Sequence, residues 1–166
     1  TGIFGSPWAR LGDKIIEGNH FDYVVLITIG VGGTEIARWT TGGDLHGNLL
    51  SAISEANSIG IPVNYLLWHQ GESDAYVEHT KKDEYIRMFN EMKSSLRKNG
   101  FPGPIYVCTA TWGSGFRENP EIQSAQSEIV KMNSSDFVFS GPNTDAYGYA
   151  FRWDGVHFSR EGLDKF

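Results

Sequence analysis

The chain has 166 residues, enough for one domain with a hydrophobic core, and its 40% hydrophobic and 20% charged residues are typical of a globular protein. The formal net charge of -6 gives no reason to expect nucleic acid or an anionic membrane as partner, and no apolar run approaches the ~20 residues of a membrane span. The single cysteine, Cys108, excludes an internal disulfide and a thiolate metal cluster, and its apolar strand marks it as core filler.

The first part of the chain predicts a helix, a buried strand and a second helix. Ser6 and Pro7 are typical of an N-cap and a first helical turn, and they open a helix to about Glu17. Residues 23–29 are continuously apolar and rich in β-branched side chains, which predicts a central parallel strand covered on both faces. Glycines end this strand. The helix that follows has one apolar face, formed by Leu45, Leu49, Ile53, Ala56 and Ile59.

The second part predicts three more strands, at residues 63–68, 105–109 and 137–139. Thr80 resembles the first residue of a capping box, with Asp83 in place of Glu, and its helix ends near Gly100. Asn119 opens another helix, and Ser159 is the predicted N-cap of a last, clipped helix. The side chains expected to face inward from the two middle helices are Tyr85, Phe89, Met92, Leu96, Ile122, Ala125, Ile129 and Met132.

This alternation predicts a single α/β domain over residues 1–166, with a parallel sheet and helices on both faces. Functional sites in such sheets lie beyond the carboxyl ends of the strands. The first loop there is residues 30–35, where Gly32 and Gly33 let backbone amides approach a ligand and stabilise an oxyanion. The alternative is a tight turn without function. The glycine spacing matches neither a dinucleotide fingerprint nor a Walker loop.

The second loop is residues 68–74, six of which are polar or small and follow a buried strand. Gln70 offers an amide donor to a developing oxyanion, and Glu72 and Asp74 can orient neighbours or bind hydroxyl groups. The alternative is a hydrogen-bonded turn in which the two carboxylates cap backbone amides. His69 and Glu72 have the H-x-x-E spacing of some metal sites, but no third ligand follows, so a metal is not predicted.

The third loop is residues 153–159, with an Asp–His pair three residues apart across a glycine. The unperturbed pKa of histidine suits proton transfer near neutrality, and a carboxylate on the other ring nitrogen fixes its tautomer. Asp154 and His157 are therefore candidate catalytic residues, and the alternative is a surface pair before a helix. The remaining histidines are expected to be surface or structural residues: His20, His46, His69 and His79.

Together, the three loops resemble the SGNH (GDSL-like) hydrolases, in particular the carbohydrate acetylesterase and sialate O-acetylesterase-like (SASA) branch. The resemblance lies in Gly32-Gly33-Thr34 with Trp39, in residues 68–74 and in residues 154–159 with Gly162. It covers the chain from about Leu11 to its end. It implies a three-layer α/β/α sandwich with a parallel, flavodoxin-like sheet of about five strands. It also implies acyl-ester hydrolysis through a serine, without metal or organic cofactor.

The resemblance also implies roles for single residues. It implies that His157 is the general base and that Asp154 orients it. It also implies that the backbone amide of Gly32, next to Gly33, lies in the family motif that supplies oxyanion donors. The wider family has an Asn side chain in its third sequence motif. In this chain the corresponding segment is residues 68–74, which has Gln70 and then Glu72. These two residues are the remaining candidates for oxyanion and substrate contacts.

The nucleophile of the family lies in a Gly-x-Ser segment after the first strand, which this chain lacks. Ser6 follows Gly5 but leads into Pro7 and a helix, with no apolar strand before it, and is rejected as nucleophile. The sheet is therefore expected to lack its first strand unless a preceding N-terminal segment or a second chain supplies it. The C-terminal end is also expected to be clipped. A piece of a longer enzyme and a natural non-catalytic remnant both stay open.

The predicted function is a carboxylic ester hydrolase that removes acetyl or another short acyl group from a carbohydrate, with this piece inactive by itself. The alternative is an inactive carbohydrate-binding or assembly module, in which Trp39, Trp112 and Trp153 stack on sugar rings. A flavodoxin-like phosphate module is a third option, disfavoured by the lack of a phosphate loop. The expected partner is an acylated carbohydrate, with no nucleic acid or membrane. Secreted or periplasmic settings are favoured over the cytoplasm.

Overall fold

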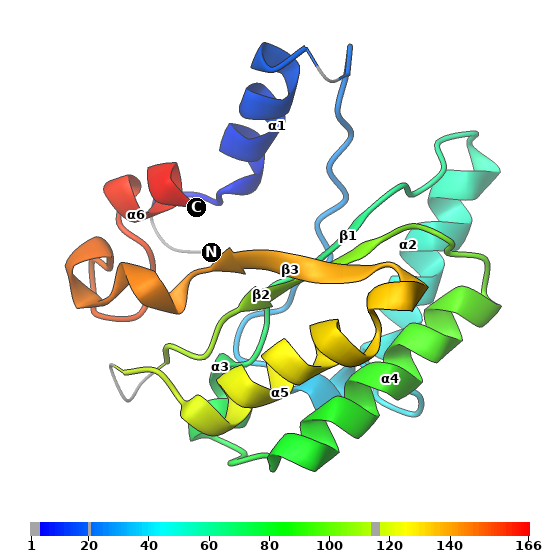
Figure 1. Cartoon of the computed structure of the whole chain (residues 1–166). Helices are drawn as coiled ribbons and strands as arrows, with labels where there is room; N and C mark the ends of the chain where they lie inside the picture. The colour runs from blue at the N-terminus through cyan, green and yellow to red at the C-terminus, as the bar shows by residue number, and fades with distance from the viewer. Residues whose placement is uncertain (1–3, 20, 114–116) are drawn as a thin grey trace.

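The strands of the protein form one parallel sheet with the order β1-β2-β3. They are β1 (Leu66–Trp68), β2 (Ile105–Thr109) and β3 (Val138–Asn143). This computed structural model describes residues 4–19, 21–113 and 117–166. Ile105 lies opposite Leu66 on one side and Val138 on the other, so the strands start in register. Their carboxyl ends all reach the same edge of the sheet (Figure 1).

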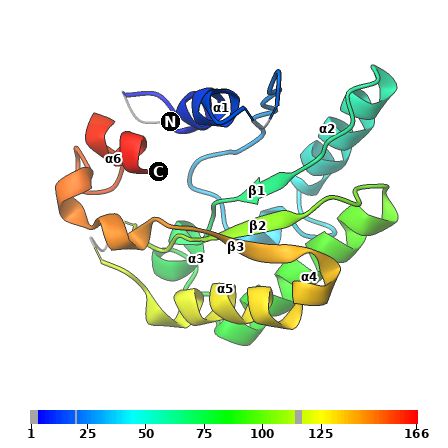
Figure 2. The ribbon, with the colours of Figure 1, turned by 45° about the horizontal axis from the view of Figure 1, so that its top comes forward.

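Helices cover both faces of this sheet. They are α1 (Trp8–Glu17), α2 (His46–Ser58), α3 (Glu72–Tyr76), α4 (Lys82–Lys98), α5 (Pro120–Met132) and α6 (Arg160–Lys165). Short 3-10 helices are η1 (Ile36–Arg38), η2 (Ser134–Asp136), η3 (Asp145–Tyr147) and η4 (Tyr149–Phe151). In Figure 2, α4 and α5 lie on one side of the strands and α1 and α6 on the other, which gives the expected three-layer α/β/α fold. Within the described residues, no helix combines the length and the apolar character needed to span a bilayer.

The helix patterns in the sequence fold as their period predicts. The α4 stripe of Tyr85, Phe89, Met92 and Leu96 is fully buried against the sheet and its neighbouring helices. Asn119 caps α5, because its side chain accepts hydrogen bonds from the amides of Glu121 and Ile122. Ser159 caps α6 in the same way. These caps and stripes place the loops that follow each strand.

Several local predictions were wrong in detail. The first helix starts at Trp8, after Ser6 and Pro7, and no side chain caps it. Thr80 does not cap α4, because its hydroxyl donates to the buried carboxylate of Asp74 instead. Two side chains expected in the core, Ile59 and Met132, sit at helix ends and are exposed.

The predicted central strand at residues 23–29 is the largest difference. The segment is extended but pairs with no strand in the described part of the chain, and Val25 and Ile27 are 52% and 46% exposed. A strand needs a hydrogen-bonded neighbour as well as an apolar pattern. The pattern correctly indicates an extended chain, but the described residues provide no neighbouring strand for the ladder.

Candidate active site

The Asp154–His157 pair lies in residues 152–158, between η4 and α6, which we call the acid–base loop. Asp154 Oδ2 lies 2.7 Å from His157 Nδ1, and Oδ1 accepts from the backbone amides of Val156 (2.9 Å) and His157 (2.7 Å). Gly155 has a φ of +84° and makes the turn that folds the carboxylate back. The carboxylate thereby selects Nδ1–H as donor and leaves Nε2 as the acceptor that a general base needs.

The imidazole of this pair faces solvent. The His157 side chain is 54% exposed and that of Asp154 28%, and the Trp153 ring stacks beside the imidazole with ring centroids 6.4 Å apart. Burial raises the pKa of Asp154, but hydrogen bonds from the His157 side chain and from two backbone amides outweigh it and lower the pKa to about 2. Asp154 is therefore ionised at neutral pH.

A buried arginine supports the acid–base loop. The Arg152 guanidinium donates to the carbonyls of Val156 and Thr144, and it lies over the rings of Trp112 and Phe158, at 5.2 and 4.5 Å from their centroids. The residue is only 8% exposed. Two hydrogen bonds and two ring contacts of one rigid planar group thus help to fix the backbone that carries the pair.

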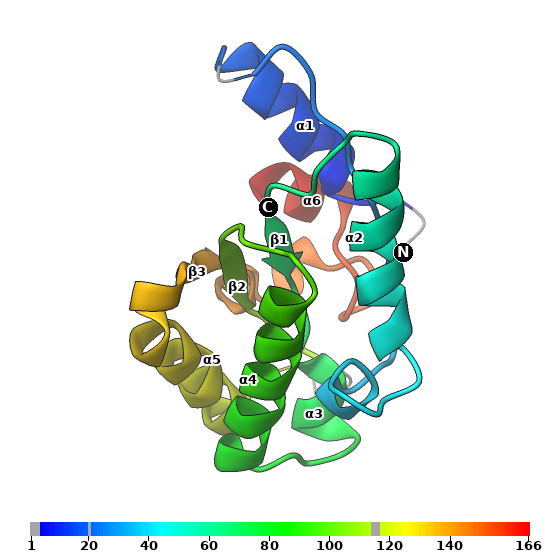
Figure 3. The ribbon, with the colours of Figure 1, turned by 90° about the vertical axis from the view of Figure 1, so that its right-hand side faces the viewer.

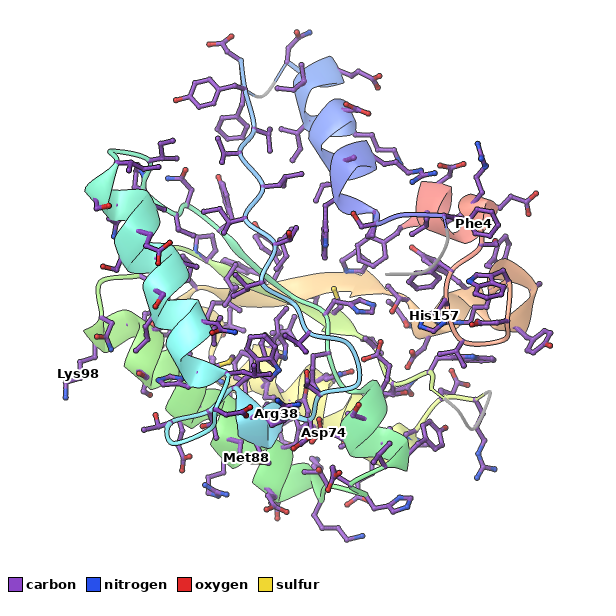
Figure 4. The ribbon with its side chains drawn as sticks, turned by 180° about the vertical axis from the view of Figure 1, so that it is seen from behind. Phe4, Arg38, Asp74, Met88, Lys98 and His157 are labelled. Carbon is purple, nitrogen blue, oxygen red and sulfur yellow. The ribbon has the colours of Figure 1, made fainter. Side chains whose placement is uncertain are left out.

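The loops after all three strands meet the acid–base loop. His69 follows β1, and its Nε2 lies 3.0 Å from Thr144 Oγ1, beyond β3, while its ring lies 6.3 Å from that of Phe158. Trp112 follows β2 and donates from Nε1 to the Gly155 carbonyl at 2.9 Å. The residues 68–74 turn and the acid–base loop therefore converge at the carboxyl edge of the sheet. Figure 4 shows His157 at this edge, on the same side as α6.

Gln70 lies in a buried polar network rather than at the surface. Its amide nitrogen donates to the Thr34 carbonyl (3.0 Å) and to Asp74 Oδ2, and its oxygen accepts from the Tyr85 hydroxyl (2.9 Å). Both amide hydrogens are used in these bonds, so neither is free for an oxyanion. Asp74, a residue of α3 that is labelled in Figure 4, also accepts from the Ile36 amide. Gln70 thus ties the turn after β1 to the glycine turn at residues 30–34.

Glu72 opens α3 and lies beside His69, with Oε1 3.7 Å from Nδ1. Its side chain is 37% exposed, so it can also accept a hydrogen bond from a ligand hydroxyl. In residues 4–19, 21–113 and 117–166, no three His, Cys, Asp or Glu side chains gather as a metal-ligand set. The H-x-x-E pattern at this position forms a half-buried pair of His69 and Glu72.

Gly32 and Gly33 lie in an exposed turn at the same edge. Gly33 has a φ of +71°, which favours glycine, and a Cβ at either position would meet no atom within 4 Å. Thr34 holds the turn, since its hydroxyl donates to the Val31 carbonyl (2.8 Å) and accepts from Trp39 Nε1 (2.9 Å). The two glycine amides therefore belong to an open, internally supported turn.

The three tryptophans proposed for sugar stacking differ in exposure. Trp39 is 4% exposed and packs edge-on against Trp68 in the core, so that prediction was wrong for Trp39. Trp112 is half-buried beneath Arg152. Trp153 is 46% exposed beside His157 and presents an open ring.

Sequence reasoning missed Asp145, which joins two of the converging loops. This carboxylate is 2% exposed and accepts from the backbone amides of Thr111 (2.8 Å) and Trp112 (3.0 Å). Its signal was available, because polar residues 143–145 lie a few positions after a predicted strand, near the same edge of the sheet as residues 69–74. Arg152, two residues before Asp154, was missed because a buried cation has no local signature.

Comparisons with known proteins identify the family of the chain. The sequence profile of the family described as "Carbohydrate esterase, sialic acid-specific acetylesterase" matches residues 5–166. A probable carbohydrate esterase of Arabidopsis thaliana is 26% identical over 137 residues, which cover 82% of this chain and 49% of the relative.

The fold is also found among solved structures. An X-ray structure of a protein from Arabidopsis thaliana matches with a TM-score of 0.61 at 21% identity, covering 81% of this chain and 52% of that one. The chain thus spans about half the length of these relatives. The match over residues 5–166 confirms the predicted resemblance: the chain belongs to the family of carbohydrate esterases that includes the sialic acid-specific acetylesterases.

Proposed function

We propose that this chain forms the acid–base and oxyanion part of an ester hydrolase that removes an acetyl or other short acyl group from a carbohydrate. The observation that carries the proposal is the 2.7 Å contact of Asp154 with Nδ1 of a solvent-facing His157. Membership of a carbohydrate esterase family supports the substrate class.

The proposed reaction uses a serine from outside residues 1–166 as nucleophile. His157 Nε2 takes the serine proton as the oxygen attacks the acyl carbon, and ionised Asp154 stabilises the resulting imidazolium. The imidazolium then gives its proton to the sugar oxygen, and the C–O bond breaks. In the second half, His157 takes a proton from water, which attacks the acyl-enzyme, and returns that proton to the serine as the acid leaves.

The oxyanion donors in this proposal are the backbone amides of Gly32 and Gly33. At comparable sites one such donor stabilises the transition state by about 3 kcal/mol. Gln70 holds the glycine turn in place, because its amide group donates hydrogen bonds to Thr34 and Asp74. Glu72 and the open ring of Trp153 are proposed to contact the sugar, through a hydroxyl and a stacking face respectively.

The alternative is a carbohydrate-binding or assembly module without catalysis, and the exposed Trp153 ring is the observation that favours it. The residues encoded before Thr1 distinguish the two functions. A strand followed by Gly-x-Ser favours hydrolysis, and a start without a serine favours binding.

The hydrolase proposal is tested in the protein encoded by the complete reading frame. His157→Asn should lower the rate of p-nitrophenyl acetate hydrolysis by ~10³-fold or more, because Asn cannot take the serine proton. His79→Asn is the matched control: His79 is exposed with a φ of +50°, which Asn tolerates, and its rate should stay at the wild-type value. Undiminished hydrolysis by His157→Asn would refute the assignment.

A further inference from the structure

Two polar side chains beyond the carboxyl end of β1 face each other without a hydrogen bond. Nδ1 of His69 lies 3.7 Å from Oε1 of Glu72, which is too far for a hydrogen bond. Glu72 is the first residue of α3, which lies beyond the carboxyl end of β1 (Figure 3). In the part of the chain that the structure describes, no other group donates to or accepts from either atom. We call these two groups the acceptor pair.

The hydrogen bonds around His69 assign the proton of its ring. Nε2 lies 3.0 Å from the Thr144 hydroxyl, which donates its own hydrogen to the Thr109 carbonyl at 3.0 Å. A hydroxyl has one hydrogen, so Thr144 accepts from His69 and the neutral ring carries its proton on Nε2. Nδ1 is then an acceptor, as is the Glu72 carboxylate. Two acceptors lie side by side with no hydrogen between them, so a ligand that supplies donors completes the arrangement.

The acceptor pair is held in place and is still accessible. Thr144 fixes one edge of the His69 ring, and the rings of Phe158 and Phe166 lie beside it, with centroids 6.3 and 5.4 Å away. The side chains of His69 and Glu72 remain 19% and 37% exposed. Because the imidazole is already fixed before a ligand arrives, little side-chain entropy is lost when Nδ1 accepts a hydrogen bond.

The acceptor pair lies beside the acid–base loop. Phe158, whose ring contacts the imidazole of the pair, follows His157 directly in the chain. A Cβ built at Gly113 would meet the Cβ of Glu72 at 3.6 Å, and the preceding residue, Trp112, donates a hydrogen bond to the acid–base loop at 2.9 Å. A sugar whose ester group lies at His157 therefore has its neighbouring hydroxyls on the side of the acceptor pair.

Two hydroxyls on neighbouring sugar carbons fit the chemistry of the acceptor pair. They present two O–H donors side by side, one for Nδ1 and one for the carboxylate. The hydrogen bond to the carboxylate is charge-assisted and is therefore stronger than one between neutral groups. A carboxylate or phosphate group of a ligand fits this position poorly, because it has no hydrogen to donate and would bring a second negative charge beside Glu72.

We propose that His69 and Glu72 bind two neighbouring free hydroxyls of the sugar next to the acyl ester, and thereby select acyl esters that carry a vicinal diol. This selectivity rests on the proposed ester hydrolysis at His157. It adds His69 to the groups that contact the substrate, and it gives the carboxylate of Glu72 a defined partner, one hydroxyl of a pair.

Two acetyl esters test this selectivity in the protein encoded by the complete reading frame. Glycerol monoacetate carries two neighbouring hydroxyls, and propyl acetate is the same ester without them. The ratio of kcat/KM for glycerol monoacetate to that for propyl acetate should fall about tenfold in Glu72→Gln, because a charge-assisted hydrogen bond is lost. Glu78→Gln is the matched control, since Glu78 is exposed and lies outside the acceptor pair. An unchanged ratio in Glu72→Gln would overturn the proposal.

Two variants of His69 separate diol binding from a structural role. His69→Gln keeps a donor for Thr144 in the place of Nε2 but has no acceptor in the place of Nδ1, so the kcat/KM ratio should fall while the Tm changes little. His69→Asn has an amide in the place of Nδ1 and loses the Thr144 bond, so it should lower the Tm and keep most of the ratio. A ratio that instead falls with the Tm would show a purely structural role and would sink the proposal.

NMR keeps failure of this proposal apart from failure of the proposed hydrolysis. If the wild-type protein hydrolyses neither of the two esters nor p-nitrophenyl acetate, the proposed hydrolysis has failed, and sugar binding still decides the role of the acceptor pair. Methyl β-glucoside should shift the ring C–H resonances of His69 in the wild type and in Glu78→Gln, but not in Glu72→Gln. Equal shifts in all three proteins, or no shift in the wild type, would contradict binding of a diol by the acceptor pair.

Discussion

At the scale of residues, the Asp154–His157 pair is built for orientation rather than for stability. Both side chains reach solvent, where an ion pair contributes little to folding. Both oxygens of the Asp154 carboxylate nevertheless accept hydrogen bonds. One accepts from the His157 imidazole and the other from two backbone amides. This arrangement fixes one tautomer of His157, which is what proton transfer requires.

The lowered pKa of Asp154 predicts a pH dependence. Its folded pKa of about 2 lies below the ordinary value of ~3.9, so the ionised carboxylate stabilises the folded chain above about pH 4. That contribution is lost as the pH falls from about 4 to about 2. The Tm difference between wild type and Asp154→Asn should therefore shrink over this window. A carboxyl carbon titration by NMR should give a midpoint near 2, and a midpoint near 4 would contradict the geometry.

At the scale of elements, the acid–base loop is tied to the neighbouring loops through its own first residue, Arg152. Arg152 bridges the loop to Thr144 beyond β3, and the rings of Trp112 and Phe158 enclose it. Burial lowers the pKa of Arg152, while the charges of Asp145, Glu72 and Asp154 raise it. A cation held in this way links the ends of two strands to the loop that carries His157.

Removing this cation should loosen the loop. Arg152→Met should lower the free energy of unfolding by about 2 kcal/mol, because it removes two hydrogen bonds and the ring contacts. It should also broaden the His157 Nδ1–H resonance by making the loop mobile. Arg87→Met is the control: Arg87 forms an exposed i,i+4 pair with Glu91 in α4, and its loss should leave both measurements near wild type. A sharp Nδ1–H signal in Arg152→Met would contradict the supporting role.

At the scale of the whole molecule, the packing is uneven. The buried cluster joins the three strands to α2, α4 and α5. In contrast, α1 has no buried residue, and the segment after it exposes apolar side chains. Local opening should therefore cost least at residues 21–31 and most in the sheet and α4.

Limited digestion with chymotrypsin tests this order. The first cuts in residues 1–166 should follow Phe21, Tyr23 or Leu26, which are all at least 40% exposed. The aromatic residues of α4, Tyr85 and Phe89, are fully buried and should resist. The remaining fragment should keep its far-UV circular dichroism, because the buried cluster lies after the cuts. First cleavage within α4 or β2 would contradict the prediction.

Much of the local structure could be read from the sequence. The buried stripe of α4 follows from a 3.6-residue period, and the Asn119 and Ser159 caps follow from hydrogen bonds that span two or three residues. The contact of Asp154 with His157 is equally short-ranged, since one glycine turn closes it.

The sequence by itself determined the α/β alternation, the helix faces and the Asp–His pair, because each depends on residues a few positions apart. It also determined the family, through three short motifs that follow one another in order along the chain. Only the tertiary structure decided that Gln70 turns inward, that Thr80 bonds Asp74 instead of capping α4, and that residues 23–29 stay unpaired. Each of these outcomes depends on a hydrogen-bond partner outside the local pattern. A backbone ladder or a buried amide takes whichever partner the packed chain brings within about 3 Å, and no local pattern specifies that partner.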